Sequence, residues 1–372
     1  MKTAIASIPL KLRLLYEKFY THNLVRISRH RDCKRNLKDK LRHTRPQPLS
    51  AAQRQEIISY WSQFTDVRRY MRWFEFYSTV CQESAQLKYY IPDSIHFADI
   101  DATFTSPRRS AELDDKNLYD LYFHDVNRAV TVMRKVNGEL LDKDYHPITR
   151  EQAMELYSQA ETVVSKDSKL AVGGHSIKFH TTGTCTPADF IHYLEGKSDL
   201  VVQELLHQHD TLNGIHRESI NTIRIMSLLL DGHTHLLSSV LRMGKDGARV
   251  DNASSGGLVC GINDDGTLKE VAFDKNGNRY TRHPQGGPFK GIKIEGFDKC
   301  CSLVKDLAGR MCTTSRLISW DLSIDPAGEP LLIEVNLSYG ELDFHQLCNG
   351  PIFGSLTTQV LEHVFWHGPE GR

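Results

Sequence analysis

The chain has 372 residues, of which 40% are hydrophobic and 25% are charged, and its formal net charge is zero. This composition is ordinary for a globular protein, and the length suits two or three sub-domains around a sizeable core. No apolar run approaches the roughly 18 residues that span a bilayer, and eight cysteines without a CxxC pair favour reduced thiols over a disulfide scaffold. Lys11 and Arg13 interrupt the apolar start of the chain, so we predict a cytoplasmic protein without a signal peptide.

The first fifty residues are strongly basic, with thirteen Lys and Arg against three acidic residues, so the rest of the chain carries the balancing negative charge. Leucines and Phe19 recur at helical spacing in residues 8–24 and predict an amphipathic helix. Two interpretations of this basic arm stay open. It docks on the acidic body of its own chain, or residues 1–45 bind an anionic membrane surface. We expect no nucleic-acid partner.

Residues 1–110 are predicted to form a basic helical region. Pro46 and Pro48 mark a linker, and Ser50 is a favourable N-cap for a helix over about 51–64. A second helix is predicted over 67–81. The aromatic residues of this region indicate a helical core rather than a base-stacking platform: Trp61, Tyr70, Trp73, Phe74, Phe76 and Tyr77.

After residue 110 the pattern changes to short strands mixed with helices. Strands are predicted at 161–166, 199–206, 221–230, 234–243, 316–324 and 330–336, and helices at 116–126, 149–160, 186–196 and 299–311. Asp231-Gly232 and Ala327-Gly328 have the composition of hairpin turns. The sequence therefore predicts an α+β fold, with one lobe over 111–210 and a second over 211–372.

Residues 316–336 predict a β-hairpin, because two apolar strands flank the turn composition DPAGEP. If the hairpin is symmetric about Ala327-Gly328, Asp321 faces Glu334 at a Cβ separation of roughly 5 Å, and Asn336 points to the same face. Two opposed carboxylates repel each other unless a divalent cation lies between them, and oxygen ligands suit Mg²⁺. The alternative is a solvated polar face with an accidental acidic pair. The opposite face carries predicted core residues: Ile318, Trp320, Leu322, Leu331, Ile333 and Val335.

The spacing of Asp321, Glu334 and Asn336 resembles the metal-binding hairpin of the ATP-grasp superfamily, as in D-alanine–D-alanine ligase. The segment WDLSIDPAGEPLLIEVNLSYG is most similar to the sugar-transfer-associated ATP-grasp family, and ESINTIRI, VDNASSGGLVCGINDDG and ELDFHQ resemble further segments of that family. The resemblance covers about 110–372. It implies an ATP-grasp fold, in which two α+β lobes clasp ATP, here with a basic helical N-terminal extension. It also implies two Mg²⁺ ions at these three residues.

The resemblance implies further contacts to ATP. Lys116 and Lys166 match the two lysines that bind the phosphates, and a compact ammonium suits that task. The segment Gly173, Gly174, His175 and Ser176 resembles the Gly-rich lid over the phosphates. The hinge strand would place Gln203, Glu204, Leu205 and Leu206 beside the adenine, and Asp210 is the candidate for the ribose. Asp167 replaces the proline that commonly follows the second lysine in this family.

Arg224 lies in an otherwise apolar strand, and a buried arginine needs a partner. Its fork suits phosphate or an acyl-phosphate oxygen, so Arg224 and Lys166 are the candidate catalytic residues, with a structural ion pair as the alternative for Arg224. The ligase pattern often has an Arg two residues before the metal Asp, where this chain has Ser319. Asn252, Gly256 and Gly257 are candidates for the acceptor side of the cleft, and a plain glycine turn is their alternative.

The resemblance implies an ATP-dependent carboxylate–amine ligase that activates a carboxylate as an acyl phosphate, with the acid tied to polysaccharide or secondary-metabolite biosynthesis. No P-loop, HExxH or GxSxG motif points to another chemistry. The alternative is a nucleotide-binding scaffold or regulator without turnover. The departures at Asp167 and Ser319 favour that alternative, and the intact Asp321, Glu334 and Asn336 oppose it. The predicted location is cytoplasmic, and peripheral at a membrane if residues 1–45 bind lipid.

Overall fold

The computed structural model describes residues 12, 26–105, 110, 113–169, 176–251, 256–337 and 340–366. The chain divides into two compact units, one formed by Met1–Phe104 with Glu341–Arg372 and the other by Thr105–Gly340. Residues 341–372, which the sequence assigns to the second lobe, thus group with the N-terminal region. The amphipathic helix predicted over 8–24 lies outside the described residues except for Leu12. No helix among the described residues has the length and apolar character to cross a membrane.

The first unit is helical, and an N-cap that the sequence predicts begins one of its helices. Its helices are α3 (Arg26–Thr44), α4 (Ala51–Trp61), α5 (Met71–Tyr77), α6 (Asp93–Ile95), α7 (Asp101–Phe104), α14 (Leu342–Asn349) and α15 (Thr357–Phe365), with the shorter turns η2 (Val67–Tyr70), η3 (Ser84–Tyr89), η4 (His96–Ile100) and η7 (Gly354–Leu356). Ser50 accepts a hydrogen bond from the Gln53 backbone, and the Gln53 side chain accepts one in return, so this capping box starts α4 as predicted. The predicted aromatic core is confirmed, because all six aromatic side chains are buried.

The basic helix α3 turns several of its charges into its own unit. Arg26 Nη2 lies 2.6 Å from Asp99, and Lys40 Nζ lies 2.5 Å from Asp343 on α14. Lys40 is 9% exposed, so its charge is taken up inside the protein. These pairs favour the interpretation in which the described part of the basic arm docks on its own chain.

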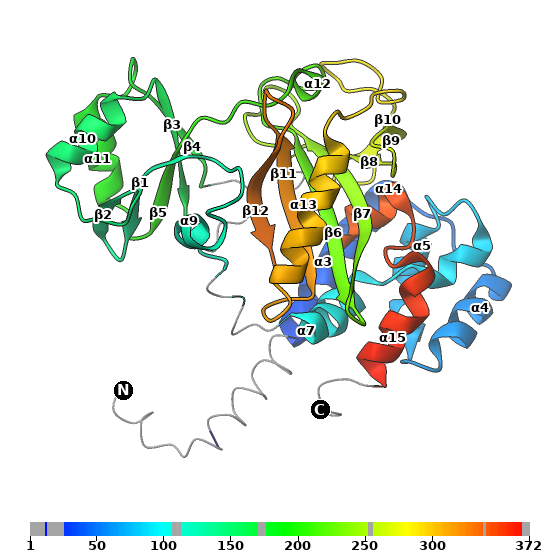
Figure 1. The fold of residues 1–372 in the computed structure, drawn as a ribbon. Helices are drawn as coiled ribbons and strands as arrows, with labels where there is room; N and C mark the ends of the chain where they lie inside the picture. The colour runs from blue at the N-terminus through cyan, green and yellow to red at the C-terminus, as the bar shows by residue number, and fades with distance from the viewer. Residues whose placement is uncertain are drawn as a thin grey trace. The chain divides into compact units, whose positions relative to one another are not determined.

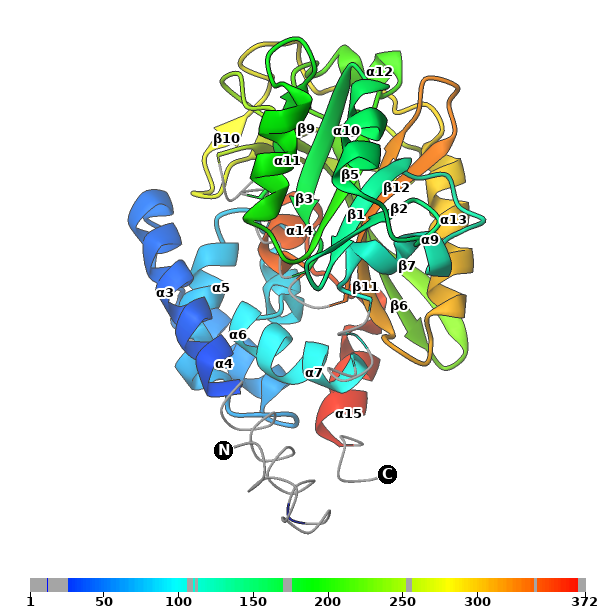
Figure 2. The ribbon, with the colours of Figure 1, turned by 90° about the vertical axis from the view of Figure 1, so that its left-hand side faces the viewer.

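The second unit contains a five-stranded antiparallel sheet covered by two helices. The strands are β1 (Thr131–Val136), β2 (Glu139–Asp142), β3 (Thr162–Asp167), β4 (Lys178–Thr181) and β5 (Leu200–Glu204), in the order β2-β1-β5-β3-β4. The helices α10 (Arg150–Ser158) and α11 (Pro187–Glu195) lie side by side over this sheet (Figure 2). The rings of Tyr157 and Phe190 stack at 4.2 Å between centroids in the core beneath them.

A seven-stranded antiparallel sheet forms the rest of the second unit. Its strands are β6 (Thr222–Leu230), β7 (His233–Met243), β8 (Leu258–Ile262), β9 (Leu268–Phe273), β10 (Arg279–Tyr280), β11 (Leu317–Ile324) and β12 (Pro330–Asn336), in the order β10-β9-β8-β7-β6-β11-β12. The helix α13 (Phe297–Arg310) crosses one face of the sheet (Figure 1). Trp320 is fully buried in the core under it and donates from Nε1 to Ser227 Oγ at 2.8 Å. The α+β class is confirmed.

Short elements connect the two sheets within the second unit. The single turn η5 (Lys116–Leu118) and the helix α9 (Tyr119–Tyr122) precede β1, and α12 (Asp210–Asn213) follows β5. The side chain of Asp115 caps η5 by accepting a hydrogen bond from the Asn117 backbone at 3.0 Å. The segment that the sequence predicts as one helix over 116–126 is therefore shorter and divided.

The β11–β12 hairpin has the predicted register at one end and a bulge near its turn. Asp321 pairs with Glu334, as a turn symmetric about Ala327-Gly328 predicts. Toward the turn, Leu322 pairs with Leu332, so β12 contains one extra residue, Ile333. Leu332 consequently enters the core, whereas Ile333, which was predicted to face the core, is only partly buried. The sequence missed this bulge because strict alternation assigns each residue of a strand to a face.

Candidate active site

Asp321 is the centre of a buried charge cluster on the seven-stranded sheet. Arg224 lies directly opposite it on β6 and donates from Nε and Nη2 to the two carboxylate oxygens, each at 2.7 Å. Both side chains are about 95% buried, so this fork is strongly shielded from water. Burial alone would raise the pKa of Asp321, but the charges of Arg224 and Arg242 outweigh it and lower the pKa. The carboxylate is therefore held in its ionised form.

Arg242 on β7 is a member of the cluster that the sequence does not single out. Its Nη1 lies 3.3 Å from Asp321 Oδ2, and its Nε lies 3.7 Å from Asp251. Burial raises the pKa of Asp251, and the charge of Arg242 opposes that rise. The sequence does offer one signal, an arginine in an apolar strand, which also marks Arg224. Arg242 lies at the end of β7, however, where an arginine is usually solvated.

Glu334 brings the first lobe's lysines into the same cluster. Lys116, at the start of η5, places its Nζ 2.6 Å from Glu334 Oε1 although it is only 7% exposed. Lys166 lies on β3, where burial and then the charge of Lys116 lower its pKa to about 8, and the charge of Glu334 acts in the opposite direction. A buried ammonium whose pKa is lowered by burial and by a neighbouring cation favours an anion beside it.

Four cationic side chains thus converge on Asp321 and Glu334 from four elements, namely β6, β7, η5 and β3. The acidic pair that the sequence places face to face is compensated by these cations rather than left in repulsion. Tyr119 of α9 fixes the strand beside Glu334, because its hydroxyl accepts the Val335 backbone N–H at 3.0 Å. The arrangement can bind a polyanion and hold charged oxygens in a fixed geometry.

The oxygen donors at this position also fit a magnesium ion. Asn336 donates from Nδ2 to Asp321 Oδ2 at 3.3 Å, which places its amide beside the carboxylate pair. The described residues hold no cluster of three or more His, Cys, Asp and Glu side chains suited to a metal, so the third donor would be an amide oxygen. Hard carboxylate and amide oxygens are the ligands that Mg²⁺ accepts in partial protein shells completed by phosphate and water.

Five other residues predicted to contact ATP lie at the end of β5 and in the segment that follows it. Glu204 ends β5 with an exposed side chain, and its backbone N–H donates to Val130 at 2.9 Å. Gln203 is buried and donates to the Ala129 carbonyl at 3.5 Å. Asp210 is exposed in α12, whereas Leu205 and Leu206 are half-buried. Within the described part of the chain, none of these five residues makes a side-chain hydrogen bond or ion pair with Asp321 or Glu334.

Part of the predicted lid and acceptor side falls outside the described residues. This applies to Gly173, Gly174 and His175 and to Asn252. Ser176 is described, and its Oγ accepts the Asp167 backbone N–H at 3.4 Å. Gly256 has φ of +108°, a backbone conformation that L side chains rarely adopt. The local backbone conformation therefore explains why a glycine occupies this position.

Residues 188–362 match the family model described as sugar-transfer-associated ATP-grasp. The matched segment includes Arg224, Arg242, Asp321, Glu334 and Asn336, whereas the two lysines precede it. This segment of the chain is thus similar to an ATP-grasp family. More narrowly, the match confirms the predicted resemblance to the sugar-transfer-associated family over these residues. No curated protein sequence matches the chain.

Solved structures give more distant similarities. D-alanyl-alanine synthetase A from Vibrio cholerae shares 10% identity over 71% of this chain and 68% of its own, with a TM-score of 0.43. An L-amino acid ligase from Bacillus licheniformis shares 13% over 69% of this chain and 48% of its own, at 0.39. D-cycloserine synthetase shares 12% over 81% of each chain, at 0.40. The chain spans about half the length of the L-amino acid ligase. Similarities this low do not identify a substrate.

Proposed function

We propose that the chain is an ATP-dependent carboxylate–amine ligase. The observation that supports this most directly is the opposed pair of Asp321 and Glu334, in register on one sheet face and surrounded by four cationic side chains. The match to an ATP-grasp family over residues 188–362 supports the same chemistry. A nucleotide triphosphate with a divalent cation brings both the negative charge that the four cations need and the positive charge that the two carboxylates need.

Each residue has a separate role in this proposal. Asp321, Glu334 and Asn336 would hold Mg²⁺, in one or two ions, which would neutralise charge on the phosphates. Lys116 and Lys166 would contact phosphate oxygens as compact charges. Arg224 and Arg242 keep Asp321 ionised and oriented, and their field would also stabilise the acyl phosphate. The hinge residues (Gln203, Glu204, Leu205, Leu206 and Asp210) would contact the nucleoside, and the lid (Gly173, Gly174, His175 and Ser176) would cover the phosphates.

The reaction proceeds in two displacements. A carboxylate oxygen of the substrate attacks the γ-phosphorus of ATP, the bond to the bridging oxygen breaks, and ADP leaves. The amine nitrogen then attacks the acyl carbon, the bond to the phosphate oxygen breaks, and phosphate leaves as the nitrogen loses a proton. The chain's own contribution is positioning and charge stabilisation, because none of these bonds involves a protein atom.

The test is ADP release from MgATP in a screen of carboxylates paired with amines. Glu334→Gln should reduce turnover by more than about 100-fold, as expected when a ligand to the reacting phosphates is lost. Glu329→Gln is a matched control, because Glu329 lies at the turn of the same hairpin and pairs with Lys299 at 2.6 Å on the surface. Wild-type turnover in the Glu334 variant would overturn the metal assignment.

The same experiment separates the ligase from the alternative of a nucleotide-binding scaffold or regulator. A scaffold would bind MgATP in calorimetry but release no ADP with any acid and amine pair. A ligase would release ADP only when its carboxylate is present, with the amide formed in equal amount. The family's association with sugar transfer points to an acid from polysaccharide or related secondary pathways, so uronic and amino acids come first in the screen.

The proposal does not extend to a membrane surface. Arg26 and Lys40 of the basic helix pair with acidic residues of their own unit, which leaves less free charge for lipid. Vesicles of anionic lipid that bind the full chain in a salt-sensitive way, and lose it after deletion of residues 1–45, would restore that interpretation.

A further inference from the structure

The position of Lys116 depends on a backbone that is held from two directions. Its own N–H donates to the Ser168 carbonyl at 2.9 Å, two residues beyond Lys166 on β3. The next residue, Asn117, is 1% exposed, and its Nδ2 donates to the Lys135 carbonyl of β1 at 3.2 Å. The turn η5 is only three residues long, so its contacts with neighbouring segments help to set where the Lys116 ammonium lies.

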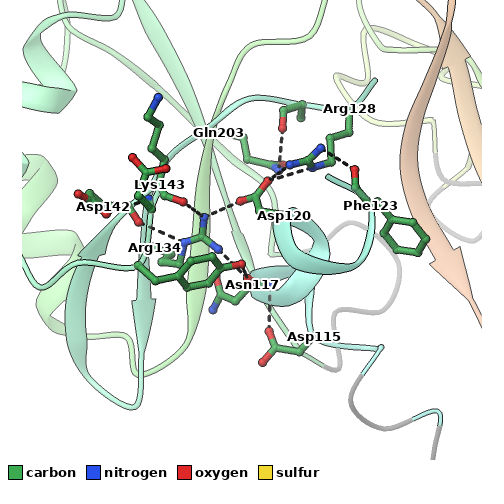
Figure 3. A network of polar contacts seen from close by, with 12 residues as sticks. Asp115, Asn117, Asp120, Phe123, Arg128, Arg134, Asp142, Lys143 and Gln203 are labelled. Atoms are coloured by element: carbon green, nitrogen blue, oxygen red, sulfur yellow. Dashed lines mark hydrogen bonds and ion pairs between the residues drawn. The ribbon is translucent and has the colours of Figure 1, made fainter. Parts of the chain in front are cut away.

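A separate polar network binds this turn at the Asn117 carbonyl. Arg134 Nη1 donates to it at 2.6 Å, and the Tyr145 hydroxyl donates to it at 2.7 Å (Figure 3). The Arg134 guanidinium also lies 3.8 Å from the centroid of the Tyr145 ring, so the two donors brace each other. Both come from the β1–β2 hairpin and the loop after it, and β5 lies between β1 and β3, the strand of Lys166.

Arg134 is fully buried and its donors are almost completely used. Nη2 donates to the Lys143 carbonyl at 2.8 Å and to Asp120 Oδ2 at 2.5 Å, and Nε donates to the Asp142 carbonyl at 3.3 Å. Asp120 in turn accepts from Arg128 Nε at 2.9 Å. Figure 3 shows these contacts meeting between α9 and the β1–β2 hairpin.

A buried polar network of this kind adds little to the free energy of unfolding by itself. A buried ion pair replaced by well-packed apolar residues often leaves stability unchanged or improves it, because desolvation of the charges is costly. What the network provides is geometry, since five fixed N–H groups admit one placement of the surrounding carbonyls. The carbonyl at its end belongs to the residue directly after Lys116.

We propose that Arg134 and Tyr145 are positioning residues that act through the Asn117 carbonyl to hold Lys116 against Glu334. This rests on the proposed function only for its effect on ATP, because the placement of Lys116 is a property of the protein itself. Neither residue contacts Asp321 or Glu334, so each acts on the site through the segments that it holds, chiefly the turn η5.

The test uses Tyr145→Phe, which removes one hydroxyl and leaves the ring beneath Arg134. Two quantities are measured on the full chain: the rate at which an amine-reactive reagent labels Lys116, followed by mass spectrometry, and the KM for ATP. The labelling rate should rise roughly threefold to tenfold, the size expected for one lost hydrogen bond. The KM for ATP should rise by a similar factor with little change in kcat.

The matched control is Tyr157→Phe in the same lobe. Tyr157 is fully buried, and its hydroxyl donates to the Cys185 carbonyl at 3.0 Å, away from η5. This variant should leave both the labelling rate and the KM for ATP unchanged. Equal effects of the two variants would show a general loss of stability and would overturn the proposal.

A double variant separates positioning from a direct effect. In a Lys116→Met background, Tyr145→Phe should cause no further rise in the KM for ATP, because its effect passes through the missing ammonium. An undiminished additional rise would overturn the proposal. If Lys116 labelling responds as expected but the wild-type protein neither binds nor consumes ATP, the positioning stands and the ligase proposal fails. Unchanged labelling in Tyr145→Phe refutes the positioning whatever the protein does with ATP.

Discussion

Two buried charge clusters, one in each unit, solve the same electrostatic problem in opposite ways. In the helical unit, two carboxylates share one cation: Lys40 lies 2.5 Å from Asp343, and the Tyr77 hydroxyl donates to Asp93 at 2.5 Å. Burial, followed by the charge of Asp343, raises the pKa of Asp93 well above its ordinary value. That cluster reaches neutrality by taking up a proton.

The cluster at Asp321 keeps its carboxylate ionised instead. Arg224 and Arg242 lower the pKa of Asp321 against the effect of burial, and Lys116 forms an ion pair with Glu334. This cluster therefore keeps Asp321 as an ion held by arginines, where the other cluster favours a protonated carboxyl. The difference teaches that the balance of buried charge, rather than its presence, distinguishes a binding site from a structural polar core.

The comparison predicts a large difference between two identical substitutions. Asp321→Asn removes the carboxylate to which Arg224 donates two hydrogen bonds and should lower the free energy of unfolding by about 3–5 kcal/mol. Near pH 4, where the raised pKa of Asp93 favours its protonated form, Asp93→Asn should change the free energy of unfolding by less than about 1 kcal/mol. Urea unfolding of both variants beside wild type measures this. Equal losses would mean that the two clusters are alike.

The lysines of the two clusters should also differ in how much they contribute to the free energy of unfolding. Lys40→Met removes the ammonium that lies 2.5 Å from the buried Asp343 and should cost about 3 kcal/mol. Lys166→Met removes a half-buried ammonium whose pKa is lowered by burial and by Lys116, so stability should hold or rise slightly while the KM for ATP increases. Denaturant titration and ADP release measure the two effects. A Lys166 variant that unfolds as easily as the Lys40 variant would contradict the view that Lys166 serves ligand binding.

A close backbone approach beside the site gives a smaller expected effect. A Cβ at Gly340 would overlap the Ser319 hydroxyl and lie 3.1 Å from Ser319 Cβ, next to the position where Ser319 pairs with Asn336. Gly340→Ala should therefore cost about 2 kcal/mol by overpacking and reduce turnover. Gly183→Ala is the control, because no atom lies within 4 Å of its Cβ. Wild-type stability of the Gly340 variant would show that Ser319 moves aside freely.

The strands and their best local feature could be predicted from the sequence. Apolar runs and the DPAGEP turn place β11 and β12, and the predicted pairing of Asp321 with Glu334 is confirmed. That pairing depends on the bulge at Ile333, which shifts the register by one residue and which a period of two does not predict. For Arg224 the sequence offers a structural ion pair only as the alternative to a contact with phosphate, and it does not identify Asp321 as the partner. These two residues are 97 positions apart, and no local pattern joins them.

Long-range packing accounts for what the sequence could not show. Arg242 reaches the site only because β7 lies where the tertiary fold places it, and the pairing of the predicted Lys116 with Glu334 joins residues far apart in the chain. Likewise, ELDFHQ looks like a continuation of the metal hairpin, yet it forms α14 in the helical unit, where Gln346 bonds both backbone groups of Ile91 at 2.9 Å. A motif's place in the chain does not reveal which unit it packs into.

The pH dependence of stability gives the smallest effect per unit change and tests the comparison most directly. Asp93 has a raised pKa in the folded state, so its stabilising contribution is present below the unfolded pKa of about 3.9 and is lost as pH rises toward the folded value. Asp93→Asn removes that loss, so its stability relative to wild type should increase between pH 4 and 7 by at most about 1.4 kcal/mol per pH unit. Asp321 has a lowered pKa, so its contribution is instead lost as pH falls. The deficit of Asp321→Asn should therefore shrink below about pH 4. Unfolding curves across this range measure both slopes, and slopes of the same sign would show that both carboxyls share one charge state.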